Sequence, residues 1–95
     1  MNDSLLEQKA ELLKALAHPA RLCIVANLYY KGKCNVTNIQ QCMSMPQSTI
    51  SQHLAKLKSA GIIKGVRNGL EIEYQVINED AIGIIKTLIP CNKNL

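Results

Sequence analysis

The residues between Gln47 and Ala60 carry side chains that could form hydrogen bonds to the bases of DNA. Glutamine can pair with adenine through both of its side-chain polar atoms, and serine or threonine can bond to several base edges. The stretch contains no Asp or Glu, which phosphate would repel. We therefore assign base contacts to Gln47, Ser48, Thr49 and Gln52, and count Ser51 and His53 with the same DNA-binding set.

A helix is needed to present these side chains, and the sequence predicts one between Pro46 and Gly61. Its core residues Ile50, Leu54 and Leu57 recur at helical spacing. The opposite face then carries small polar groups, while Lys56 and Lys58 are suited to the phosphate backbone. The alternative is an ordinary polar face that contacts only water.

A two-stranded hairpin follows this helix. Ile72, Tyr74 and Val76 alternate with polar residues, and Asn68-Gly69 is a hairpin turn signal. We place Arg67 and Asn68 at the hairpin tip, where they could contact the minor groove or the DNA backbone. The alternative is a plain surface turn.

The remaining periodic segments predict four more helices. They cover residues 4–16, 19 to about 30, 37–43 and 79–89, and His18 is expected to cap the second of them ahead of Pro19. The fold class is mainly α with a small β-hairpin, in the order α-α-α-α-β-β-α. Residues 1–95 form one winged helix-turn-helix domain.

Composition limits what such a domain can be. Its 95 residues include only three aromatic side chains, all Tyr, so its core is small and association with a second copy is expected. No apolar stretch is long enough to span a membrane, and Met1-Asn2-Asp3-Ser4 has neither the basic start nor the apolar run expected of a signal peptide. We therefore expect a cytoplasmic protein with reduced cysteines, and the net charge of +4 fits a polyanionic partner.

Two groups of residues make the chain resemble the ArsR-SmtB family of winged-helix repressors. They are the segments Leu13–Leu22 and Gln47–Leu57, and the order of the elements agrees along almost the whole chain. The resemblance implies a homodimer formed by helices of about residues 4–16 and 79–89. It also implies that the helix beginning at Gln47 enters an inverted-repeat operator in double-stranded DNA, and that an inducer releases the DNA by shifting the dimer between two conformations.

The metal sites of that family are not reproduced. Asn35-Val36-Thr37 stands where arsenic sensors carry Cys-Val-Cys, and residues 79–89 contain no histidine of the kind that zinc and nickel sensors use. Neither His18 nor His53 is expected to be a metal ligand. We expect no metal site and no cofactor.

The four cysteines, Cys23, Cys34, Cys42 and Cys91, leave the inducer open. Some relatives detect oxidants or sulfane sulfur with one cysteine on the second helix and one near the end of the last. Cys23 and Cys91 fall in those elements, each about a turn earlier than the family's positions. Cys23 could equally be a small buried core residue, and a soft metal or As(III) bound by cysteines is an alternative inducer.

Two other classes of function compete with a repressor. An enzyme is disfavoured because the chain has no glycine-rich phosphate loop, no paired carboxylates in a recognisable setting and no Ser-His-Asp context. A winged helix that binds protein, or nucleic acid without sequence preference, is the second alternative. The acid-free stretch favours DNA.

Overall fold

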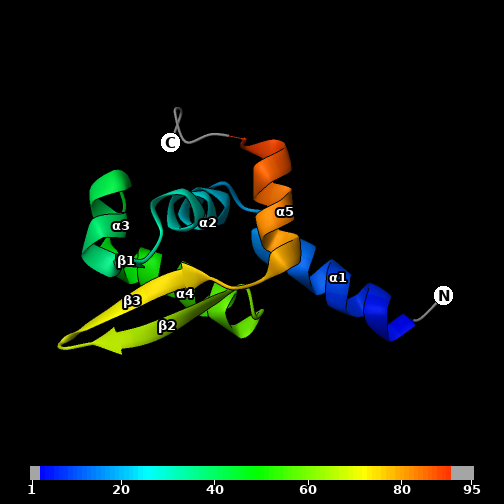
Figure 1. Ribbon diagram of the computed structural model, residues 1–95, viewed down its shortest axis with the longest axis horizontal. Coiled ribbons are helices and arrows are strands. Elements are labelled where there is room, and N and C mark those ends of the chain that lie inside the picture. The colour runs from blue at the N-terminus through cyan, green and yellow to red at the C-terminus, as the bar shows by residue number, and fades with distance from the viewer. Residues whose placement is uncertain (1–2, 91–95) are drawn as a thin grey trace.

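The computed structural model describes residues 3–90, which form five helices and three short strands within that range. The order is α1 (Asp3–Leu16), α2 (Pro19–Lys31), β1 (Cys34–Asn35), α3 (Val36–Cys42), α4 (Gln47–Ser59), β2 (Ile63–Asn68), β3 (Glu71–Val76) and α5 (Glu79–Leu88). The hairpin β2–β3 projects from one end of the molecule, and α1 and α5 lie at the other end (Figure 1). This is the mainly helical winged-helix fold that the sequence predicts, with one strand that it did not predict.

The helix boundaries follow from local chemistry. The Nδ1 atom of His18 accepts a hydrogen bond from the Ala20 amide at 3.1 Å, and Pro19 follows at a position where a helix needs no N–H donor. The cap predicted at His18 is therefore confirmed. Asn35 caps α3, which begins one residue earlier than predicted, since its Oδ1 accepts from the Asn38 amide at 2.7 Å. Gly61, with φ of 74°, follows the end of α4 in a left-handed conformation that favours glycine.

The additional strand, β1, joins the hairpin to form an antiparallel sheet in the order β1-β3-β2. Cys34 pairs with Tyr74 and Asn35 with Glu73. The two residues of β1 lead directly into α3, so the sheet connects the hairpin to the start of the helix-turn-helix.

One aliphatic core holds these elements together. Ile24 and Leu28 of α2, Ile50 and Leu57 of α4, and Ile85 of α5 are each at most 1% exposed. Burial of such side chains is the main source of stability, at roughly 1.5–3 kcal/mol each. No helix within residues 3–90 has the length and apolar character needed to cross a membrane.

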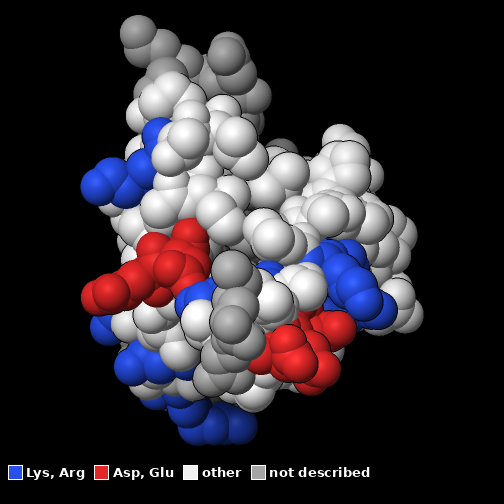
Figure 2. Space-filling model, turned by 90° about the vertical axis from the view of Figure 1, so that its right-hand side faces the viewer, with Lys and Arg blue, Asp and Glu red and all other residues white. Residues whose placement is uncertain are grey.

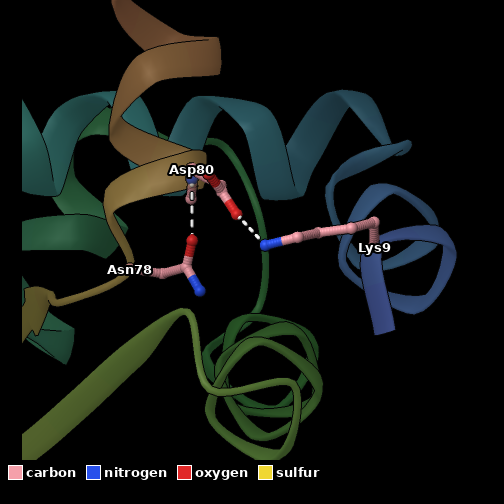
Figure 3. Close-up of polar contacts among 4 residues, drawn as sticks. Lys9, Asn78 and Asp80 are labelled. Atoms are coloured by element: carbon pink, nitrogen blue, oxygen red, sulfur yellow. Dashed lines mark hydrogen bonds and ion pairs between the residues drawn. The ribbon is translucent and has the colours of Figure 1, made fainter. Parts of the chain in front are cut away.

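The first and last helices are also joined by a surface ion pair. Lys9 Nζ of α1 lies 2.5 Å from Asp80 Oδ2 of α5, while Asn78 Oδ1 caps α5 by accepting from the Ala81 amide at 2.9 Å (Figure 3). Both partners of the ion pair are about half exposed, so the contact adds little stability.

Candidate nucleic-acid interface

Helix α4 is held by its apolar stripe and presents its polar side outward. Ile50, Leu54 and Leu57 are at most 2% exposed, and α4 packs against α2, α3 and β2. Six residues of the predicted DNA-binding set on this helix are exposed, namely Gln47, Ser48, Ser51, Gln52, Lys56 and Lys58. The helix begins directly after Pro46, whose carbonyl accepts from the amides of Thr49 and Ile50.

Two members of the predicted set are less accessible than the others. Thr49 and His53 are half-buried on the flank of α4. The His53 ring lies against His18 at the start of α2, with a distance of 4.7 Å between ring centroids. Burial lowers the pKa of His53, and the nearby charges of His18, Arg21 and Lys56 lower it further. Neutral imidazole is therefore favoured at this position.

The charged side chains of α4 are all positive. The helix has no acidic residue in its first turn and two basic residues, Lys56 and Lys58, in its last. Within residues 3–90, neither lysine forms an ion pair. Their ammonium groups thus remain available to a negatively charged partner.

The hairpin differs from the prediction at its tip. Asn68 is the last residue of β2 and pairs with Glu71, so the two-residue turn consists of Gly69 and Leu70. Placing Arg67 and Asn68 at the very tip was therefore wrong by one or two residues, because only Gly69, with φ of 68°, takes up a left-handed conformation in the turn. Arg67 and Asn68 are both exposed, and Asn68 Nδ2 donates to Glu73 Oε1 at 2.9 Å.

The cysteines are distributed over several elements. Cys23 is half-buried on α2, and Cys34 is 7% exposed at the start of β1. Cys91, the second predicted sensing residue, lies outside the described residues. Among the side chains that the structure describes, no three His, Cys, Asp or Glu residues are grouped so that they could hold a metal ion.

Sequence reasoning missed one polar contact beside Cys23. Asn27, one helical turn further along α2, is 4% exposed and donates from Nδ2 to the Cys23 carbonyl at 2.9 Å. The same nitrogen lies 3.4 Å from Cys23 Sγ. The only sequence signal was a single amide within the apolar run Ile24–Leu28.

An apolar surface remains uncovered where α1 and α5 meet. Leu13 is 54% exposed and Leu88 is 63% exposed, and both line a groove between these helices together with Leu12, Gly83 and Ile84. Leu5 and Leu6 extend the exposed apolar side chains along α1. Figure 2 views this end of the molecule and shows separate groups of charged residues around a broad uncharged area.

Comparison with known proteins agrees with this arrangement. The profile of a family described as a helix-turn-helix domain matches residues 16–66. The transcriptional repressor PagR of Bacillus anthracis is 52% identical over 85 residues, which cover 90% of this chain and 85% of PagR. The crystal structure of PagR superposes with a TM-score of 0.85 over 92% of this chain and 99% of that chain, at 49% identity.

More distant relatives carry similar descriptions. The repressor SmtB of Mycobacterium tuberculosis is 37% identical over 85% of this chain and 59% of its own length. The structure of the repressor BigR from Xylella fastidiosa has a TM-score of 0.80 at 29% identity, covering 98% of this chain and 94% of that chain. A structure described as reduced HlyU from Vibrio cholerae has a TM-score of 0.82 at 25% identity, covering 95% of this chain and 96% of that chain.

Proposed function

Because the chain belongs to the ArsR-SmtB family of winged helix-turn-helix transcriptional repressors, we propose that it acts as a homodimer on an inverted-repeat operator and releases the DNA in response to a chemical inducer. In this proposal the protein acts in the cytoplasm, where it binds double-stranded DNA. The proposal assigns it no catalytic activity.

The observation that carries the proposal is the exposed face of α4. A helix that enters the major groove contacts base edges mainly with its N-terminal half. Gln47, Ser48 and Gln52 are exposed in that half, and we assign them to base contacts together with Ser51. Thr49 and His53 are half-buried on the flank of α4; we keep Thr49 among the base contacts and His53 in the same DNA-binding set.

Phosphate contacts are assigned to the other end of α4 and to the hairpin. Lys56 and Lys58 are exposed, and their charges are not neutralised within residues 3–90. Arg67 is exposed near the end of β2 and extends this basic set. Asn68 is engaged by Glu73, and Glu71 accepts from Asn35 Nδ2 at 2.9 Å, so we expect the hairpin to contribute less than α4.

The dimer is proposed to form through α1 and α5. Leucine side chains that are about half exposed on two adjacent helices are costly for a monomer in water. A two-fold axis through this surface would place α4 and the hairpin of each protomer on the outside. An inverted repeat has the same two-fold symmetry, so each half-site would receive one copy of α4.

For the inducer we favour chemistry at a thiol. Cys23 is half-buried on α2, and α2 packs against both of the proposed dimer helices. A related structure is described as reduced HlyU, so a relative has been obtained in a defined redox form. Cys91 is proposed as the partner thiol on sequence grounds. A soft metal or As(III) is the other candidate inducer.

The proposal is tested by measuring binding of the reduced protein to duplex DNA from its own promoter region, between about 50 and 200 mM salt. A specific repressor binds a fragment with an inverted repeat more tightly than a scrambled duplex of the same composition, and keeps that preference as salt rises. Binding that disappears with salt and shows no sequence preference would instead support a nonspecific nucleic-acid-binding module. No binding to any duplex would favour a protein-interaction role.

A further inference from the structure

Asn27 is an unusual residue for the interior of α2. It is 4% exposed and lies between Ala26 and Leu28, both at most 1% exposed. A buried amide without its hydrogen bonds destabilises a protein by about 1–3 kcal/mol, so an apolar residue would be expected at such a position unless the amide has a role.

The amide is only half satisfied. Its Nδ2 atom donates to the Cys23 carbonyl at 2.9 Å and approaches Cys23 Sγ at 3.4 Å. Its Oδ1 atom is buried and has no hydrogen-bond partner within the residues that the structure describes. Since Oδ1 belongs to the same small planar group as Nδ2, an acceptor that is not in use lies close to the Cys23 sulfur.

We propose that Asn27 is a positioning residue for a reactive thiol at Cys23, with Nδ2 supporting the thiolate and Oδ1 accepting a hydrogen bond from the hydroxyl group of the oxidised sulfur. An N–H donor stabilises the anionic form of sulfur, which is the form that reacts. The unused acceptor matches a sulfenic acid, whose S–O–H group extends one atom beyond the sulfur and ends in a donor. This inference deepens the proposed thiol-based induction and rests on it only for the effect on DNA binding.

The reaction that we assign to this pair uses a hydroperoxide, here hydrogen peroxide. The Cys23 thiolate attacks one peroxide oxygen, so that an S–O bond forms as the O–O bond breaks. Sulfur is oxidised and the peroxide is reduced, with the products Cys23–S–OH and hydroxide, which takes a proton from water or buffer. The hydroxyl hydrogen that came from the peroxide stays on the sulfenic acid, and this S–O–H group donates a hydrogen bond to Oδ1.

Two variants separate this role from a structural one. Asn27→Leu keeps the side-chain shape and removes both the donor and the acceptor. Asn27→Ser has a single donor, which a helical serine can use to bond the carbonyl four residues earlier, and so leaves none for the sulfur. Asn38→Ser, which changes an exposed amide on α3, is the matched control.

The measurement is the rate at which Cys23 is alkylated by iodoacetamide across a pH series, with the full chain reduced and each cysteine followed by mass spectrometry. In both Asn27 variants we expect the half-maximal pH to rise by about one unit and the rate at neutral pH to fall about threefold. The fall is smaller than tenfold because a more basic thiolate is also the better nucleophile. After peroxide treatment, both variants should also yield less sulfenic acid at Cys23 that dimedone can trap.

The outcomes are distinct. An unchanged rate and pH profile in Asn27→Ser overturns the proposal, even if Asn27→Leu is slow or fails to fold. Alkylation of Cys34, which is buried in the native protein, reports any general loosening of the fold. If the reduced wild-type protein does not bind DNA, the proposed function is contradicted. The role of Asn27 is then still decided by the alkylation rates of Cys23.

Discussion

The imidazole rings of His18 and His53 lie 4.7 Å apart, measured between their centroids, and are tilted by 51°. One ring caps the N-terminus of α2 and the other belongs to α4. The contact therefore joins the start of a core helix to the helix that we assign to the major groove. The protonation state of His53 therefore affects how α2 and α4 pack against each other.

The first prediction is that His53 makes stability depend on pH. Burial, with the charges of His18, Arg21 and Lys56, lowers its pKa in the folded state below the ordinary 6.5. Below that value the unfolded chain binds the proton first. The contribution of His53 to the free energy of unfolding is then complete above about pH 6.5 and is lost as pH falls through the interval between the unfolded and the folded pKa.

Denaturant unfolding at a series of pH values checks this, with His53→Gln as the comparison. The variant should show a flatter dependence below about pH 6.5. An equally steep decline in His53→Gln would assign the effect to other groups.

Gln52 is predicted to contribute to sequence preference. Gln52→Ala should weaken binding to the preferred operator by about 1–3 kcal/mol for each half-site and leave binding to a scrambled duplex almost unchanged. Fluorescence anisotropy titrations on both duplexes measure this difference. Gln8→Ala, which removes an exposed glutamine from α1, is the control and should change neither affinity. Equal losses on both duplexes would contradict a base contact.

Lys58 is predicted to contribute affinity without preference. Lys58→Ala should weaken binding to operator and scrambled DNA alike and reduce the slope of log K against log salt by about 0.9 per protomer. Titrations at four or more salt concentrations give the slope. Lys86→Ala on α5 has the same change in net charge and should leave the slope unaltered. If Lys58→Ala and Lys86→Ala reduce the slope equally, the effect comes from the overall charge rather than from a phosphate contact of α4.

Leu13 is predicted to be essential for the dimer. Leu13→Glu places a charge on the apolar groove between α1 and α5 and should give a folded monomer, because burying an unpaired carboxylate is very costly. Analytical ultracentrifugation gives the mass. Leu70→Glu changes a leucine that is 99% exposed at the hairpin turn, and this variant should remain dimeric. A dimeric Leu13→Glu protein would place the interface elsewhere.

Gly65 is predicted to be required for the close pairing of β2 and β3. A Cβ atom there would lie 2.8 Å from Ile72 Cγ2 and 3.1 Å from Tyr74 Cε1, so Gly65→Ala should destabilise the fold by about 1–3 kcal/mol. Urea unfolding measures the loss. Lys64→Ala, on the neighbouring exposed position, should change stability by less than about 0.5 kcal/mol. Wild-type stability in Gly65→Ala would show that the Ile72 and Tyr74 side chains can move aside at little cost.

Much of the fold was predictable because its helices bury one face each. The recurrence of Ile50, Leu54 and Leu57 fixed both the extent of α4 and its outward side. The cap at His18 and the end near Gly61 followed from local backbone requirements, which are properties of a few neighbouring residues.

Features that depend on distant partners were not predictable. Strand β1 has only two residues, too few for any period, and exists because Cys34 and Asn35 lie opposite Tyr74 and Glu73. The turn at Gly69 lies one residue later than Asn-Gly suggested, since Asn68 pairs within the sheet. The contact between Asn27 and the Cys23 sulfur is local, spanning one turn of α2, but a spacing of four residues does not by itself predict a buried hydrogen bond.

Strand β1 has a consequence for how a signal could act. It attaches the hairpin to the start of α3, and α3 packs on α4, so we expect these parts of one protomer to move together. For a repressor of the proposed kind, the adjustable quantity is then the span between the two copies of α4. Successive major grooves on one side of B-DNA are about 34 Å apart, and a change of a few ångströms in that span would detach both helices together.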